Sequence, residues 1–157
     1  SLINLQRKAI NVTGRDLITL DLDAIEPGQT DNVVRTVDTL GMAYAVYSTR
    51  SHTPHRPRLR VVIPTDRTMT PDEYEPIARK VASLIGIGMM DSTTFEASRL
   101  MYWPGCSSDA QYVFRFADKP FLSADGLLAE YTDWRDVASW PQVPGSETSV
   151  RVTQLLT

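Results

Sequence analysis

Polar and apolar residues alternate over 17–23, and this period of two predicts a strand with one buried face. The apolar face carries Ile18, Leu20 and Leu22. The opposite face carries Asp21 and Asp23, so both carboxylates project from one side, separated by roughly twice the ~3.3 Å rise per residue. The apolar face of such a strand needs a cover, which later segments can supply.

A first helix is predicted over 31–40, where apolar residues recur at helical spacing. Thr30 or Asp31 is its expected N-cap, because a side-chain oxygen there can accept a bond from the first free N–H groups. Gly41 is its expected C-terminal stop. This helix can cover one part of the sheet.

The second predicted helix, 71–85, has the clearest boundaries in the sequence. Thr70 and Glu73 have the spacing of a capping box, and Pro71 occupies the first helical position. One apolar stripe runs along it and ends before Gly86: Tyr74, Ile77, Ala78, Val81, Leu84 and Ile85. The stripe predicts that this helix packs on the same sheet.

Further strands are predicted over 42–48 and 58–63, and a proline-containing turn at 53–57 makes them a hairpin with a long loop. Arg58 and Arg60 share one face of the second strand, and the register decides which face that is. Weaker patterns predict strands over 99–103 and 112–117 and a short helix over 123–131.

The order strand, helix, strand, strand, helix, strand predicts a two-layer α+β fold with an RRM-like split βαβ core. Its sheet would be mostly antiparallel, with both helices on one face and the other face free for chemistry. One domain is expected over 1–157, with a core of about 15–135 and a linker or tail over 140–157. Ser1 in place of an initiator Met suggests a piece of a longer protein.

Composition narrows the class of protein. With 42% hydrophobic and 22% charged residues, the chain of 157 residues is neither disordered, collagenous nor a coiled coil. Cys106 is the single cysteine, which excludes an internal disulfide. The chain has only two histidines, His52 and His55, so a four-ligand zinc site lacks its usual ligands. No apolar run approaches the ~20 residues of a membrane span, so a cytoplasmic protein that binds no membrane is expected.

The formal net charge of -3 speaks against nucleic acid, yet the charges are unevenly distributed. Residues 49–67 hold five arginines against Asp66 alone, whereas acidic residues dominate 109–136. This pattern is compatible with a basic binding surface and equally with an ordinary solvated surface.

Carboxylates supply the first candidate chemistry. Asp21 and Asp23 have oxygen ligands of the kind that paired Mg²⁺ or Mn²⁺ ions need for phosphoryl transfer, although such pairs also occur as exposed strand-end residues. Asp91 is a candidate third ligand; alternatively, it caps the turn Asp91-Ser92-Thr93-Thr94.

The run Thr49-Arg50-Ser51-His52 supplies the second candidate chemistry at the end of a predicted strand. Its guanidinium, hydroxyls and imidazole suit a triphosphate, and the alternative is a polar turn before Pro54. The chain has no G-x-x-x-x-G-K-[ST] loop, which excludes a P-loop nucleotide site within it.

Three motifs in this order, Asp21-Leu22-Asp23, Thr49-Arg50-Ser51-His52 and Met90-Asp91, resemble those of the archaeo-eukaryotic primase superfamily. Longer strings, SHTPHRPRLRVVIP from Ser51, TPDEY from Thr70 and SRLMYWP from Ser98, resemble primase-polymerase domains of phage and plasmid replication proteins. The likeness covers roughly 17–104. Arg50 departs from the family pattern, which has a small residue two places before the histidine.

The resemblance implies a DNA primase or DNA polymerase that makes or extends primers on a single-stranded DNA template by two-metal nucleotidyl transfer. Asp21, Asp23 and Asp91 would bind Mg²⁺ or Mn²⁺, without zinc. The triphosphate of a dNTP or NTP would meet Thr49, Arg50, Ser51 and His52, with Arg60 and Arg99 as further nucleotide-binding residues. A fused or associated helicase and a phage or plasmid origin, in the cytoplasm of a bacterial host, are also implied.

Two other functions remain open from the sequence. A non-catalytic RRM-like module would bind single strands through aromatic residues of its open sheet face. Of Tyr47, Tyr102 and Trp103, which are candidates for stacking on bases, two are expected in the core. A rolling-circle nicking enzyme fits less well, because His52-Thr53-Pro54-His55 lacks the apolar pair between its histidines.

Overall fold

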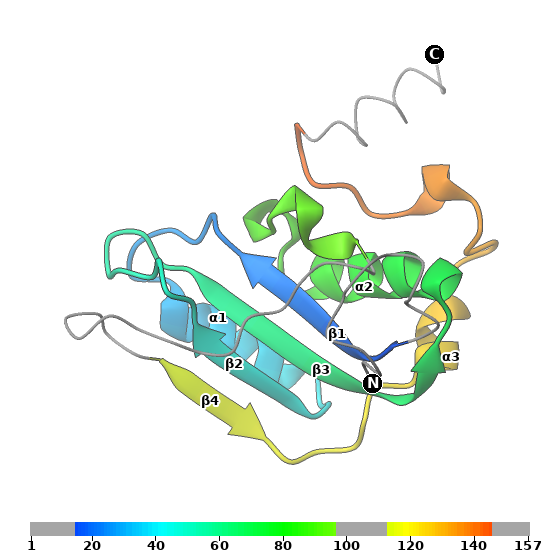
Figure 1. The fold of residues 1–157 in the computed structure, drawn as a ribbon, viewed down its shortest axis with the longest axis horizontal. Coiled ribbons are helices and arrows are strands. Elements are labelled where there is room, and N and C mark those ends of the chain that lie inside the picture. Colours follow the sequence, from blue (N-terminus) through cyan, green and yellow to red (C-terminus); the bar gives the residue numbers. More distant parts are fainter. Residues whose placement is uncertain (1–14, 97–112, 146–157) are drawn as a thin grey trace, which may run out of the picture.

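The computed structural model describes residues 15–96 and 113–145, which form a four-stranded sheet with helices on one side (Figure 1). The strands are β1 (Arg15–Leu22), β2 (Tyr44–Ser48), β3 (Leu59–Met69) and β4 (Phe114–Ala117). The helices are α1 (Thr30–Thr39), α2 (Pro71–Ile85) and α3 (Ala124–Leu128), with 3-10 turns η2 (Ile87–Met89), η3 (Ser92–Phe95) and η4 (Val137–Ser139). This is the predicted α+β fold.

The sheet has the order β1-β3-β2-β4, and all three neighbouring pairs are antiparallel. β3 therefore lies between β1 and β2, as the split βαβ plan requires. The remaining strand, β4, pairs with β2 at the far edge. On the other side of β1, the described residues form a single antiparallel bridge, between Leu22 and Met90.

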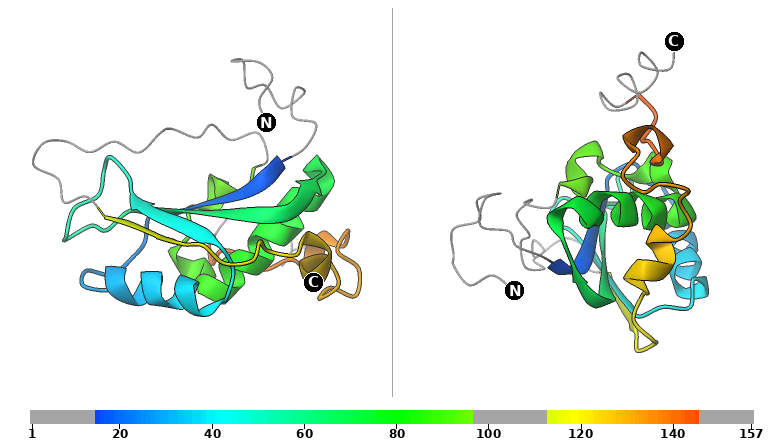
Figure 2. Two further views of the ribbon diagram at one scale, coloured as in Figure 1. Left: turned by 90° about the horizontal axis from the view of Figure 1, so that it is seen from below. Right: turned by 90° about the vertical axis from the view of Figure 1, so that its right-hand side faces the viewer.

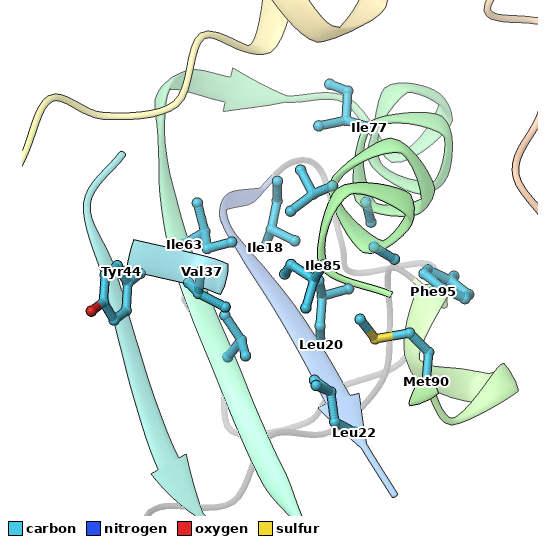
Figure 3. Close-up of a cluster of buried hydrophobic side chains, with 14 of the residues drawn as sticks. Ile18, Leu20, Leu22, Val37, Tyr44, Ile63, Ile77, Ile85, Met90 and Phe95 are labelled. Carbon is cyan, nitrogen blue, oxygen red and sulfur yellow. The ribbon is translucent and has the colours of Figure 1, made fainter. Parts of the chain in front are cut away.

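Helices α1 and α2 cover one face of the sheet, and Figure 2 (left) shows both below it. Ile18, Leu20 and Leu22 of β1 are each no more than 1% exposed and point toward the helices (Figure 3). Val37 of α1 and Ile77 of α2 meet them in the same apolar cluster. The alternation predicted for β1 thus sets which face is buried, and its other residues face away from the helices.

The predicted boundaries hold best for α2. The Thr70 hydroxyl accepts the Glu73 N–H and the Glu73 carboxylate accepts the Thr70 N–H, so the capping box forms as expected. Gly86, at φ 140°, ends the helix where predicted, because few other residues adopt this conformation.

The N-cap predicted for α1 is wrong. The helix begins at Thr30 and its N-cap is Gln29, whose side chain makes no capping hydrogen bond. The Gln29 carbonyl accepts the Val33 N–H at 3.0 Å, so the helical ladder already starts one residue earlier than expected. Gly28, at φ 84°, provides the preceding turn, and Gly41, at φ 81°, stops the helix as predicted.

Several strand boundaries also differ from the prediction. β3 continues to Met69 rather than ending at Ile63, because the Pro64 carbonyl accepts the Leu122 N–H and keeps the chain extended past the proline. β1 ends at Leu22, β2 begins at Tyr44, and the predicted helix over 123–131 is confined to α3. The expected strand 99–103 lies outside the described residues. None of the described helices is long and apolar enough to cross a membrane.

Candidate functional site

The candidate site lies at one end of the sheet, where β1 ends and β3 begins. Asp21 pairs in register with Arg60. The Arg60 Nε donates to Asp21 Oδ1 at 2.6 Å and its Nη2 donates to Oδ2 at 3.2 Å. Both side chains are largely buried, at 12% and 10% exposure, so this is a two-pronged ion pair in a desolvated place. The register thus places Arg60 on the same face as Asp21.

The segment that leads into η3 lies against the end of β1. The Asp23 N–H donates to the Met89 carbonyl at 3.0 Å, and the Asp91 N–H donates to the Asp21 carbonyl at 2.9 Å. These bonds flank the bridge between Leu22 and Met90. In Figure 1, the arrowhead of β1 and the turns after α2 meet at this end of the sheet. The backbone therefore brings Asp21, Asp23 and Asp91 together although 67 residues lie between Asp23 and Asp91 in the sequence.

Thr94 fastens the same two segments, and the sequence prediction missed it. Its hydroxyl accepts the Asp21 N–H at 2.7 Å and donates to the Thr19 carbonyl at 3.3 Å. Thr94 is 2% exposed, so water does not take its place as a hydrogen-bond partner. Its hydroxyl instead bonds backbone groups at this edge of β1 that a neighbouring strand would otherwise pair with. The sequence feature that could have predicted this role is the position of Thr94 in the turn that Asp91 was expected to cap.

The carboxylates influence one another electrostatically. The pKa of Asp23 is raised above its usual value, first because partial burial disfavours its charged form and then because the Asp91 carboxylate is near. Arg58, which precedes Leu59 and so lies across from Asp23, lowers that pKa, and Asp21 raises it. This negative potential at the strand end would be relieved by a cation.

Asp21, Asp23 and Asp91 offer carboxylate oxygens, which are the type of ligand atom that a hard divalent cation prefers. The side chains have other partners in the structure. Asp21 holds Arg60, and Asp91 Oδ1 accepts the N–H and the hydroxyl of Thr93, each at 2.9 Å. Asp91 is thus the cap of η3, the alternative that its turn sequence indicated. Among the described residues, no three acidic, histidine or cysteine side chains are grouped to hold a metal ion.

His52 organises the loop between β2 and β3. Its Nδ1 accepts the Arg58 N–H at 3.1 Å, which places its proton on Nε2. Burial lowers the pKa of the imidazole, which is 4% exposed. Across the loop, the Thr49 N–H donates to the Arg58 carbonyl at 3.0 Å, and the His52 N–H donates to the Thr49 carbonyl at 3.0 Å. His52 is therefore neutral and fixed, and it holds the backbone of Arg58 close to Asp23.

The other predicted nucleotide-binding residues divide into three groups. Arg50 and Ser51 are exposed at the tip of the loop, and Thr49 is half-buried at its base. Arg60 is engaged by Asp21, and its pKa is raised: burial lowers it, but Asp21 and the nearby Tyr47 hydroxyl raise it more. Arg99, and with it Tyr102 and Trp103, lies outside the described residues.

Comparison with solved structures agrees with this architecture. The AEP domain of the Primase-Polymerase (PrimPol) of cyanophage S-2L superposes with a TM-score of 0.54 at 13% sequence identity, covering 78% of this chain and 63% of that one. At this identity the likeness concerns the fold, and the chain spans less than two thirds of the matched structure. The likeness agrees with the α+β fold that the sequence predicted.

A comparison with protein families is more specific. The VapE N-terminal domain family matches residues 1–143, nearly the whole chain, and the chain belongs to this family. No curated protein sequence matches it significantly.

Proposed function

We propose that this domain is a template-directed nucleotidyltransferase that makes or extends primers on single-stranded DNA in phage or plasmid replication. One observation carries the proposal. A backbone ladder joins the segments of Asp21, Asp23 and Asp91 at the end of the sheet, beside the loop fixed by His52. The likeness of the fold to the AEP domain of a Primase-Polymerase supports this reaction class.

In this proposal, Asp21, Asp23 and Asp91 hold Mg²⁺ or Mn²⁺. When bound, paired ions of this kind activate the attacking 3′-hydroxyl and neutralise the leaving pyrophosphate. The protein's own part is to fix the three acid-bearing segments relative to one another before substrate arrives. Thr94 and the bridge to Met90 do this through the backbone, without involving the carboxylates.

The loop from β2 to β3 receives the triphosphate of a dNTP or NTP. Arg50 and Ser51 are exposed there. The Nε2–H of His52, whose Nδ1 is held by Arg58, would donate to a phosphate oxygen. Arg60, which donates to Asp21 in this structure, would donate to a phosphate oxygen when a nucleotide is bound, and Asp21 would then be able to hold a metal ion. A fused or associated helicase would supply the unwound template.

Primer extension on a primed single-stranded template tests the proposal. With Mn²⁺ or Mg²⁺, the native chain should incorporate nucleotides, and Asp23→Asn and Asp91→Asn should each lower the rate by at least about 100-fold. Asp72→Asn is the matched control, because this exposed acid lies in the first turn of α2. Equal rates in native and both site variants would refute the assignment, as would incorporation that continues in excess chelator.

A second function, a non-catalytic module that binds single strands, is favoured by two exposed phenylalanines on the sheet face opposite α1 and α2, Phe114 and Phe116. Such a module would bind DNA equally well with and without metal and would incorporate no nucleotide. The same extension assay therefore separates the two functions.

A further inference from the structure

The edge strand β4 exposes two large aromatic rings. Phe114 is 44% exposed and Phe116 is 69% exposed, and their ring centroids are 6.0 Å apart with planes tilted by 54°. Exposed aromatic pairs are uncommon on a protein surface without a binding role. Because they are two residues apart on a strand, both rings lie on the same face of the sheet.

That face is the one that carries the candidate site. Phe114 pairs with Tyr47 of β2, Tyr47 pairs with Arg60 of β3, and Arg60 pairs with Asp21 of β1. Residues paired across antiparallel strands project to the same side, so these four form one row across the sheet. Phe116 lies one row further from the strand end, opposite Ala45. α1 and α2 cover the other face (Figure 2).

Positive charge lies at the Phe114 end of this surface. β4 begins beside the end of β2, where the loop to β3 emerges, and Figure 1 shows both at the same end of the sheet. The loop carries exposed Arg50 and Arg56 and half-buried Arg58. Aromatic rings on a sheet whose end carries a loop with three arginines match a single nucleic-acid strand, whose bases stack and whose phosphates need cations.

The spacing of the rings also suits a single strand. Stacked bases advance about 3.4 Å per nucleotide along a strand. The 6.0 Å between the centroids is almost twice that distance, so two successive bases resting on Phe114 and Phe116 would be drawn apart from each other. This is how flat sheet surfaces display the bases of single strands. Pairing with the edge of a second copy fits less well, because β4 has only four residues.

We infer that the Phe114–Phe116 surface binds single-stranded DNA by stacking, with the phosphates directed toward the arginines of the β2–β3 loop. The inference rests on the proposed function in one respect, namely that the bound strand is the template. The row of residues from Phe114 to Asp21 would then guide this strand to the nucleotidyl-transfer site. Because stacking accepts any base, binding should depend little on sequence and strongly on salt.

Fluorescence anisotropy with an oligodeoxythymidine of about 16 nucleotides tests the inference in chelator, without nucleotide. Phe116→Ala and Phe114→Ala should each raise the Kd by at least about fivefold. Phe121→Ala is the matched control: this phenylalanine is 59% exposed but follows β4 and is outside the sheet. Phe116→Trp should bind as tightly as the native chain, whereas Phe116→Leu should not, because it is apolar but cannot stack.

Three results would overturn the inference: native affinity in Phe116→Leu, an equal loss in Phe121→Ala, or unchanged DNA binding in both alanine variants. Sedimentation of the same variants decides what replaces it. If Phe116→Ala dissociates a native dimer without changing DNA affinity, the surface is an interface between copies. Binding in chelator is independent of nucleotide incorporation by the carboxylate variants, so this inference and the proposed function can fail separately.

Discussion

Thr94 shows how one residue can position a site without taking part in its chemistry. Its buried hydroxyl is the partner of the Asp21 N–H and holds η3 against β1. Without that hydroxyl, the Asp21 N–H would be buried with one fewer acceptor, and the relative position of Asp21 and Asp91 would depend on the remaining backbone bonds. An unpaired buried group of this kind carries its full desolvation cost.

Replacement of Thr94 by a residue of the same shape should therefore be destabilising. Thr94→Val is expected to lower the free energy of unfolding by about 1–3 kcal/mol, whereas Thr94→Ser, which keeps the hydroxyl, should lose clearly less. Urea unfolding followed by circular dichroism measures both. If Thr94→Ser lowers the free energy of unfolding as much as Thr94→Val does, the methyl group contributes as much as the hydroxyl. That result would contradict the role given to the hydroxyl.

Asp21 and Asp23 should respond oppositely to neutralisation in chelator. Asp21→Ala removes the carboxylate that balances the charge of the buried Arg60 guanidinium, and breaking a buried ion pair in this way costs about 3–5 kcal/mol. Asp23→Asn removes a carboxylate whose pKa is raised by burial and by Asp91, so the variant should unfold at a higher temperature than the native chain. Thermal unfolding in chelator checks both directions. A lower melting temperature for Asp23→Asn would contradict the repulsion inferred among the three acids.

At the scale of elements, Arg67 ties β3 to two helices. It forms a two-pronged pair with Glu73 of α2, at 2.9 and 2.7 Å, and contacts Asp125 of α3 at 2.8 Å. Glu73 also closes the capping box with Thr70. Hydrogen bonds from Arg67 lower the pKa of Glu73 to about 2, although partial burial opposes this.

This shift fixes the pH dependence of the contribution from Glu73. An unfolded glutamate titrates near pH 4.3, so the contribution is complete above that pH and is lost as pH falls toward 2. Glu73→Gln keeps a capping acceptor and removes the charge. It should cost about 1–2 kcal/mol at pH 7 and almost nothing near pH 2, as measured by urea unfolding across the range. A cost that does not change with pH would exclude the ion pair; a double-mutant cycle with Arg67→Met separates the pair from the cap.

The elements differ in how far the sequence predicts them. The boundaries of α2 follow from Thr70, Glu73 and Gly86, because capping is a local interaction between nearby residues. The start of α1 was missed because its N-cap, Gln29, makes no side-chain capping bond. The turn at Gly28 marks the start of the helix instead. β4 lies within the strand that a weak pattern predicted over 112–117, but its place beside β2 depends on contacts between distant segments.

The candidate site divides in the same way. The motifs identified Asp21, Asp23, Asp91 and His52, and the structure brings their segments to one end of the sheet. The partners of these residues could not be read from the sequence: Arg60 opposite Asp21 follows from the strand register, and Thr94 from the way η3 packs on β1. No sequence pattern singled out Phe114 and Phe116, and only the strand register places them on the sheet face of Asp21.

At the scale of the whole molecule, the charge distribution acquires a different meaning. The net charge of -3 seemed to oppose binding of nucleic acid. The structure places three of the acids at one end of β1, where their mutual repulsion would favour a cation, and Arg58 of the β2–β3 loop near Asp23. Acidic and basic groups thus meet at one end of the sheet, and the face that carries them also carries Phe114 and Phe116.

Binding of Mn²⁺ is the most direct test of the claim that these three acids work as one site. Titration followed by electron paramagnetic resonance reports free Mn²⁺, with and without a nucleoside triphosphate. The native chain should bind Mn²⁺ saturably and more tightly with nucleotide, while Asp23→Asn and Asp91→Asn should each weaken binding by at least about tenfold and Asp72→Asn should not. Equal Mn²⁺ binding by the native chain and both site variants would contradict the account.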